Sequence, residues 1–174
     1  MALLSALRHQ SRHPNGTILL LLGNLSETAE KIKNRLKRNL GDLLFSRVIF
    51  LPFQTVPFYY KYLSVSTMVL DSPIYSGELT CYDALSSGIP CVTQTGNLLI
   101  QRYSTAHYRK MEIEGLATTN REDYVRQAVK LATNNDYRHE VCNQIHERFD
   151  ILLEDEAVVT EYENFLEYAV KTAY

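Results

Sequence analysis

The chain has 174 residues, of which 45% are hydrophobic and 22% are charged, and its net charge is -2. This is the composition of one water-soluble globular domain, and the weak charge excludes a basic field that would attract nucleic acid or an anionic membrane. No run reaches the ~18 apolar residues of a membrane span. Three scattered cysteines indicate free thiols in a reducing compartment, so we expect a cytoplasmic α/β domain.

Strands and helices are predicted to alternate through the first two thirds of the chain. Leucines at helical spacing near the N-terminus predict an amphipathic helix that ends before Pro14. A buried strand follows at residues 17–23, and a helix with early acidic and late basic residues at 26–40. Further strands are predicted at residues 47–52, 67–71, 90–94 and 115–118, with an aromatic-rich segment at 57–63 and helices at 79–87 and 98–110 between them.

From residue 121 onward the pattern is wholly helical. Asn120 or Thr119 can cap the first of these helices, Asn135 or Asp136 the second, and residues 154–174 form the last. Because every strand is apolar throughout, we expect a parallel sheet with helices on both faces. The prediction is a Rossmann-like, doubly wound domain at residues 1–120, with the helices of residues 121–174 packed on the same domain.

This architecture predicts where a ligand binds. In open parallel sheets, ligands bind beyond the carboxyl ends of the strands. The loops expected at that edge are residues 52–59, 72–80 and 95–98.

The turn before the helix at 79–87 contains small and polar residues that allow two interpretations. Ser76, Gly77 and Thr80 stand at the start of the helix, and Asp83 lies one turn inside it. They can be ordinary capping residues. Alternatively, the free amides of the helix end can bind a phosphate, with Asp83 accepting the hydroxyls of a ribose. Local sequence alone leaves both interpretations open.

A longer pattern around this turn favours the second interpretation. The segments "RVIFLP" and "VLDSPIYSGELTCYDALSSGIPCVTQTGNLLIQR" resemble the protein O-linked N-acetylglucosamine transferase and SPINDLY family. The resemblance covers residues 47–150, and the later segment "NREDYVRQAVKLATNNDYRHEV" takes part in it. Enzymes of this family have the GT-B fold, in which two Rossmann-like lobes face each other and the C-terminal lobe holds a nucleotide sugar.

The resemblance implies roles for individual residues. Thr80 would bind the diphosphate of the donor and Asp83 its ribose. Gly96 would keep the loop after the fourth strand close to the ligand. The aromatic segment before the third strand would face the base and ribose, and its candidate residues are Phe53, Tyr59 and Tyr62.

The chain also departs from the family pattern. Glu78 and Leu79 stand where the family usually has histidine and threonine, and a glutamate there repels a diphosphate unless its side chain turns away. Val56 and Tyr59 replace a lysine and a histidine that contact the donor, and Lys61 is the only cation nearby. Loss of charge-assisted contacts weakens binding by about 1.5–3 kcal/mol each.

Three functions follow as hypotheses. The first is the donor-binding lobe of a metal-independent glycosyltransferase that transfers N-acetylglucosamine or another hexose to protein. It needs no cofactor besides the nucleotide diphosphate sugar, and it is incomplete without an N-terminal lobe, as a fragment or a free-standing remnant. The second is an inactive interaction module derived from that lobe, with a homodimer partner or another subunit. The third is another nucleotide-binding α/β domain, although neither a GxGxxG nor a Walker sequence is present.

No catalytic residue and no metal site are identified from the sequence. The five histidines lack the spacing of a metal-binding motif. Cys81, close to a helix start, is expected to be a buried packing residue.

Overall fold

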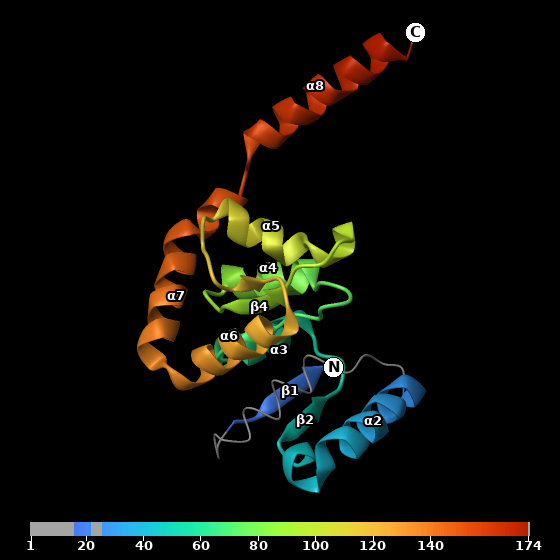
Figure 1. Ribbon diagram of the computed structural model, residues 1–174, viewed down its shortest axis with the longest axis vertical. Helices are drawn as coiled ribbons and strands as arrows, with labels where there is room; N and C mark the ends of the chain where they lie inside the picture. Colours follow the sequence, from blue (N-terminus) through green and yellow to red (C-terminus); the bar gives the residue numbers. More distant parts are fainter. Residues whose placement is uncertain (1–15, 22–25, 174) are drawn as a thin grey trace.

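The computed structural model describes residues 16–21 and 26–173, so the helix expected before Pro14 lies outside the described residues. Within them, helices and strands alternate as expected up to residue 118 (Figure 1). The strands are β1 (Ile18–Leu21), β2 (Val48–Leu51), β3 (Val69–Leu70), β4 (Cys91–Gln94) and β5 (Ala117–Thr118). The helices are α2 (Ser26–Phe45), α3 (Val56–Ser64), α4 (Glu78–Ser86), α5 (Tyr103–Lys110), α6 (Arg121–Thr133), α7 (Asn135–Arg148) and α8 (Glu156–Thr172), with 3-10 turns at Leu99–Gln101 and Phe149–Leu152.

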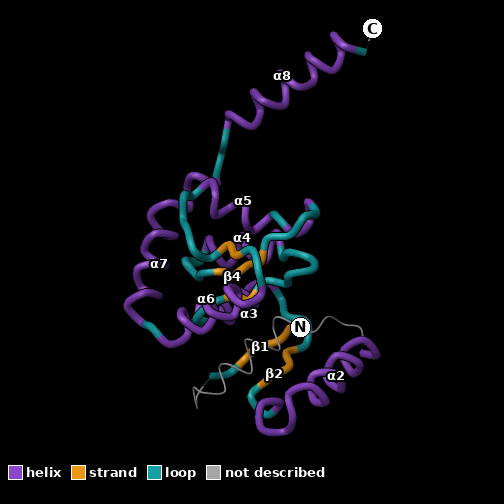
Figure 2. Tube along the Cα trace, in the orientation of Figure 1, coloured by secondary structure: helices purple, strands orange, loops and turns teal. Residues whose placement is uncertain are grey.

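All strand pairs are parallel, as the uniformly apolar strands predict. Strand β1 pairs with β2, and β4 lies between β3 and β5. The strands therefore form a two-stranded and a three-stranded sheet (Figure 2). Helices α4, α5 and α6 all contact β4, with α4 and α5 on one side of it and α6 on the other (Figure 1). The α/β fold with parallel strands is confirmed.

Two hydrophobic clusters stabilise these sheets. The larger one joins β4 and β5 to the helices around them, and its fully buried members include Val92, Tyr108, Leu116, Tyr124 and Ile145. The smaller cluster joins α2 to β2 through its buried members, which are Leu36, Leu40 and Val48. Burial of each large apolar side chain stabilises the fold by about 1.5–3 kcal/mol.

Several element boundaries differ from the sequence prediction. Helix α2 continues to Phe45 and is interrupted at Gly41, whose φ of 73° belongs to the left-handed region that glycine readily adopts. The expected helix at 98–110 is divided into a 3-10 turn and α5. The aromatic-rich segment forms α3, and Pro57 lies in its first turn, where the missing N–H has no intrahelical role.

The predicted caps of the C-terminal helices are partly right. Asn120 caps α6, because its side chain accepts a hydrogen bond from the Asp123 N–H at 2.9 Å. The cap of α7 is Asn134, which accepts from the Tyr137 N–H at 2.9 Å, rather than Asn135 or Asp136. Helix α7 therefore begins one residue earlier than the sequence suggested.

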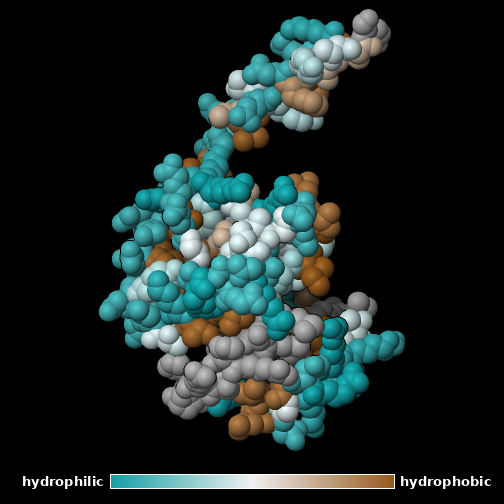
Figure 3. Space-filling view, viewed as in Figure 1, coloured by the Kyte–Doolittle hydropathy of each residue, from teal (hydrophilic) through white to brown (hydrophobic). Residues whose placement is uncertain are grey.

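The last helix differs from the expectation that all C-terminal helices pack on the domain. Helices α6 and α7 pack against each other and α6 against the sheet, whereas α8 projects from the body and has no buried residue (Figure 1). Asp155 caps α8 and forms an ion pair with Lys110 of α5. Apolar side chains lie open on its surface (Figure 3). Among the residues that the structure describes, none of the helices combines the length and the apolar character of a membrane span.

Candidate functional site

A buried carboxylate organises the turn between β3 and α4. Asp71 follows the last residue of β3 and is 4% exposed. Its Oδ1 accepts a hydrogen bond from the Gly77 N–H at 2.7 Å. Its Oδ2 accepts from the hydroxyls of Ser76, Thr93 and Ser104 at 2.8, 2.6 and 3.0 Å. These bonds fix the turn at the carboxyl end of the sheet.

The first backbone N–H groups of α4, directly after this turn, make no hydrogen bond within the helix. Cys81 makes the first intrahelical bond, from its N–H to the Gly77 carbonyl at 2.7 Å. The N–H groups of Glu78, Leu79 and Thr80 precede that bond and have no acceptor within the helix. The Thr80 hydroxyl donates to the same Gly77 carbonyl at 2.7 Å. The helix end therefore offers hydrogen-bond donors and the positive end of the helix dipole.

The Thr80 hydroxyl lies very close to the α-carbon of Gly77, the residue before α4. A Cβ built on Gly77 would lie 2.2 Å from Thr80 Oγ1 and 3.5 Å from Asp71 Oδ1. A side chain at residue 77 would therefore displace the Thr80 hydroxyl.

Two tyrosines of α3 reach the first turns of α4. The Tyr60 hydroxyl donates to Asp83 Oδ1 at 2.9 Å, and the Tyr59 hydroxyl lies 3.5 Å from the Thr80 carbonyl oxygen. Burial, followed by the charge of Asp83, raises the pKa of Tyr59 to about 12. The hydrogen bond to Asp83 raises the pKa of Tyr60 above its ordinary value. Both hydroxyls are therefore protonated at neutral pH.

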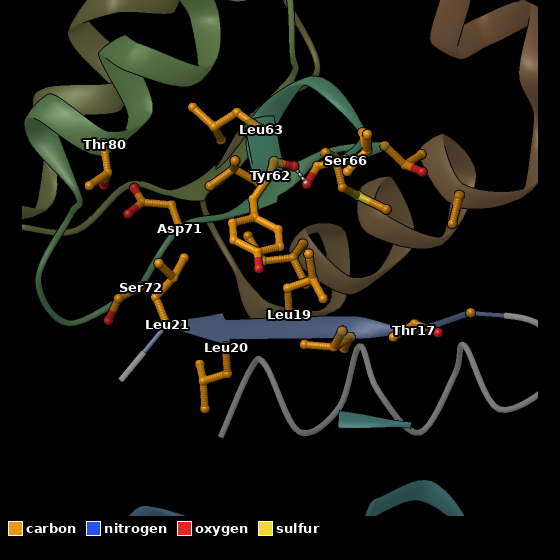
Figure 4. Close-up of a pocket in the computed structure, with 18 of the residues that line it drawn as sticks. Thr17, Leu19, Leu20, Leu21, Tyr62, Leu63, Ser66, Asp71, Ser72 and Thr80 are labelled. Atoms are coloured by element: carbon orange, nitrogen blue, oxygen red, sulfur yellow. Dashed lines mark hydrogen bonds between the residues drawn. The ribbon is translucent and has the colours of Figure 1, made fainter. Parts of the chain in front are cut away.

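A cavity of about 1080 Å³ separates β1 from β3, at the place where the two sheets are not joined. Residues 17–21 line one side of it, and residues 67–74 and part of α3 line the other. In Figure 4, Leu19 and Leu21 point from β1 into the cavity and the Tyr62 ring points toward β1. Leu20 points the other way, toward the smaller core cluster, as strand alternation requires. Asp71, Ser72 and Thr80 lie at the end of the cavity nearest α4.

The eight predicted site residues fall into three groups. Thr80, Tyr59 and Tyr62 line the cavity. Ser76, Gly77 and Asp83 belong to the turn and first turns of α4 beside it. Phe53 and Gly96 do not line the cavity: Phe53 is 65% exposed, and the Gly96 carbonyl accepts a hydrogen bond from Arg102 Nε at 2.9 Å.

Sequence reasoning missed the central role of Asp71. The signal available was a hydrophobic strand that ends in an aspartate, but the partners of that aspartate are distant in sequence. Ser104 lies 33 residues away, and the Tyr124 hydroxyl, which donates to the Asp71 carbonyl at 2.9 Å, lies 53 residues away.

The charge of Glu78 acts on α5 as well as on the helix end. Burial lowers the pKa of His107, and the negative charge of Glu78 opposes that effect. The Glu78 side chain is itself exposed to solvent. Its repulsion of an anion at the start of α4 is therefore screened by water.

Large apolar side chains are exposed in the segments that follow β2, β3 and β4, both in loops and in the first turns of helices. We call this set the apolar rim, and each of its members is 60–78% exposed. The apolar rim consists of Phe53, Val56, Ile74, Tyr75, Leu79, Leu98 and Leu99. One of its members, Leu79, lies in the first turn of α4 itself.

Comparison with known proteins identifies relatives of the chain. The model of a family described as Glycosyl transferase family 41 matches residues 6–155. A tomato (Solanum lycopersicum) protein named "Probable UDP-N-acetylglucosamine--peptide N-acetylglucosaminyltransferase SPINDLY" is 30% identical over 71 residues, which are 41% of this chain and 8% of that protein. A Caenorhabditis elegans protein named "UDP-N-acetylglucosamine--peptide N-acetylglucosaminyltransferase" is 28% identical over 92 residues, which are 53% of this chain and 8% of that protein.

A solved structure shares the fold. The structure of a mutant Thermobaculum terrenum O-GlcNAc transferase superimposes with a TM-score of 0.84 at 18% sequence identity. The match covers 100% of this chain and 35% of the solved one. The chain therefore spans about a third of that structure and a small part of the curated relatives.

Proposed function

Because the chain belongs to glycosyl transferase family 41, whose model matches residues 6–155, we propose that it is the donor-binding lobe of a GT-B glycosyltransferase. The reaction is the transfer of a sugar, N-acetylglucosamine or another hexose, from a nucleotide diphosphate to protein. The observation that supports this most strongly is the start of α4, where open amides and the Thr80 hydroxyl stand at the end of a large cavity.

The diphosphate of the donor binds at the start of α4 in this proposal. The amides of Glu78, Leu79 and Thr80 donate to its oxygens, as helix N-termini do in other phosphate sites. Asp71 sets the position of these amides through the Gly77 N–H and Ser76.

The nucleoside binds between α3 and α4. Asp83 Oδ2 has no hydrogen-bond partner among the described residues, so it can accept a ribose hydroxyl while Tyr60 holds Oδ1. The cavity beside Thr80 is lined by Tyr59, Tyr62 and the leucines of β1, which offer an apolar surface and aromatic faces to a base.

In this proposal, the lobe contributes to the reaction by electrostatic stabilisation of the leaving group. As the bond between sugar and diphosphate breaks, negative charge builds on the leaving group. Fixed amides at the α4 terminus stabilise that charge, as oxyanion-binding groups do, with no metal required. The acceptor protein and a second lobe bind across the apolar rim, which gives the exposed side chains of that rim a partner.

Nucleotide binding by the full 174-residue chain tests this proposal. The unfolding temperature is measured at increasing concentrations of uridine diphosphate and guanosine diphosphate. The same titration is made with the N-acetylglucosamine and hexose conjugates of each nucleotide. At about 100 times its Kd, a ligand stabilises the native state by about 2.7 kcal/mol. Asp83→Ala removes a charged acceptor and should weaken binding about ten- to a hundredfold. Thr80→Ala removes a hydroxyl whose proton is already donated to the Gly77 carbonyl, so it should weaken binding less.

Asp136→Ala is the matched control for these variants. It removes an exposed carboxylate from the first turn of another helix, α7, and should leave nucleotide affinity unchanged. If none of the nucleotides at millimolar concentration raises the unfolding temperature of the wild-type chain, the donor-site proposal is wrong.

A second candidate function is an inactive interaction module, and the apolar rim favours it. Tyr60 already occupies one oxygen of Asp83, and the seven large apolar side chains of the apolar rim are exposed. In this alternative, a second copy or another subunit covers the apolar rim. A dimer mass in light scattering, lost when Leu79 and Leu99 are replaced by serine, together with no nucleotide binding, would favour the module over the transferase.

A further inference from the structure

Two cysteines lie in contact beneath the start of α4. The Sγ atoms of Cys81, on α4, and Cys91, the first residue of β4, are 2.7 Å apart. Both residues are 0% exposed and neither takes part in a disulfide. The separation is well inside the about 3.5–4.0 Å of ordinary non-bonded heavy atoms. The fold therefore brings the two thiols into direct contact, although they are ten residues apart in sequence.

A metal ion does not account for this contact. Asp71 lies beside the two sulfurs, and the three side chains form the buried cluster of metal-binding residue types in the described chain. Two thiolates bound about 2.3 Å from one tetrahedral zinc ion lie about 3.8 Å apart, far more than the distance here. Both Asp71 oxygens are also occupied by hydrogen bonds from Gly77, Ser76, Thr93 and Ser104.

We propose that Cys81 and Cys91 form a reversible intramolecular disulfide, made by thiol–disulfide exchange with a low-molecular-weight disulfide such as glutathione disulfide. The two sulfurs need to approach by only about 0.7 Å to reach the S–S bond length of about 2.05 Å. The bond ties the first turn of α4 to β4, next to the carboxylate that positions the turn.

The exchange takes place in two steps. The thiolate of one cysteine attacks a sulfur of glutathione disulfide, so that a mixed disulfide forms and one glutathione thiolate leaves. The second cysteine, after loss of its proton, attacks the protein sulfur of the mixed disulfide and displaces the second glutathione thiolate. Two cysteines are oxidised by two electrons, one glutathione disulfide is reduced, and the two protons end on the two glutathione molecules.

Burial makes this exchange slow in the folded protein. Burial and the contact with Cys81 raise the pKa of the Cys91 thiol well above its usual value, which keeps the thiol protonated. Attack therefore requires a transient opening of the first turn of α4. Cys142, on α7, is partly exposed and provides an internal comparison.

Redox titration of the full chain tests the proposal. The protein is equilibrated anaerobically in glutathione buffers from fully reduced to strongly oxidising, both directly and after refolding from urea in the same buffers. Refolding gives the oxidant access to both thiols before they are buried. Samples are then quenched in acid, denatured, alkylated and mapped by peptide mass spectrometry.

The expected product is one peptide pair joined through Cys81 and Cys91, lighter by two hydrogen atoms, while Cys142 is alkylated or carries glutathione. Excess dithiothreitol should restore both thiols. The oxidised chain should unfold at a temperature higher by about 5 °C than the reduced chain, because the bond restricts the unfolded state. Cys81→Ser and Cys91→Ala should lack this shift, whereas Cys142→Ser should retain it.

The decisive result is that of the wild-type chain, because it does not depend on the folding of any variant. If Cys81 and Cys91 are both alkylated after refolding in the most oxidising buffer, the proposal is overturned. It is also overturned if either cysteine is found joined only to Cys142 or to glutathione. The experiment contains no nucleotide, so its outcome is independent of the donor-site proposal.

Discussion

Asp71 is the residue on which the geometry of the candidate site depends. It is almost fully buried, and each of its carboxylate oxygens is held by hydrogen bonds from the chain. A buried charge is tolerated when its oxygens are satisfied in this way. The Gly77 N–H is a fixed donor, whereas the three hydroxyls can rotate. The carboxylate therefore couples the backbone before α4 to the side chains of β4 and α5.

We predict that Asp71→Asn lowers the free energy of unfolding by about 1–3 kcal/mol. The amide keeps one oxygen but places an NH₂ group among donors, so at least one buried donor loses its acceptor. Urea unfolding followed by circular dichroism measures the change, with Asp136→Asn as the exposed control that should alter stability by less than about 0.5 kcal/mol. An Asp71→Asn variant as stable as the wild-type chain would show that these hydrogen bonds do not hold the turn.

At the residue scale, sequence prediction succeeded where the chemistry is local. Asn120 caps α6 through a bond to an N–H three residues away, which a local pattern can reveal. A local pattern also identifies Gly77 and Thr80 as candidates, and their role in ligand binding stays a prediction. Asp71 and Tyr60 were not, because their partners are 5–33 and 23 residues away and depend on the packing of whole elements.

At the scale of elements, α4 and α5 pack through aromatic rings around a histidine. The ring of Tyr82 lies 5.6 Å from that of His107 and 5.2 Å from that of Phe149. His107 Nδ1 is buried and has no hydrogen-bond partner among the described residues. Burial lowers the pKa of His107 below its ordinary value of 6.5. The neutral imidazole is therefore the form that this packing stabilises.

We predict that His107 makes the fold less stable in weak acid. Because its pKa is lower in the folded state, the unfolded chain binds the proton more readily. The contribution of neutral His107 to the free energy of unfolding is therefore complete above about pH 6.5. It is lost as the pH falls through the pKa that His107 has in the folded state. The urea midpoint of the wild-type chain should fall further between pH 7 and pH 5 than that of His107→Phe, which keeps the ring and cannot be protonated.

His139→Gln provides the control for this comparison. His139 is exposed on α7, so this variant removes one histidine and leaves the environment of His107 unchanged. Parallel pH profiles for the wild-type chain and His107→Phe would contradict the prediction.

The sequence predicts helices and strands well where the hydrophobic periodicity is strong. It predicts their boundaries less well where tertiary contacts determine at which residue an element ends. The parallel strands and the helices after residue 120 follow from apolar runs and helical spacing. The sequence does not predict that β1 and β3 belong to separate sheets, because a strand is equally apolar whether or not it pairs with that neighbour. The split of the helix expected at 98–110 depends on contacts such as the one between Arg102 and the Gly96 carbonyl.

At the scale of the whole molecule, two apolar surfaces are exposed on the part of the chain that the structure describes. One is the apolar rim, and the other is a stripe along α8. On α8, Val159, Tyr162, Leu166 and Val170 recur every three or four residues and are 46–65% exposed. The sequence predicts this helix, but it cannot show that α8 stands away from the body (Figures 1 and 3).

We predict that the α8 stripe drives self-association of the chain without adding to the stability of its body. Because α8 buries no side chain against the rest of the chain, Tyr162→Glu with Leu166→Glu should change the unfolding temperature by less than about 2 °C. The same double variant should shift sedimentation equilibrium toward the monomer, since it puts charge on an apolar surface that water does not solvate well. Thr160→Glu adds charge to α8 outside the stripe and should leave association unchanged. A fall of several degrees in the unfolding temperature of the double variant would instead mean that α8 packs against the body in solution.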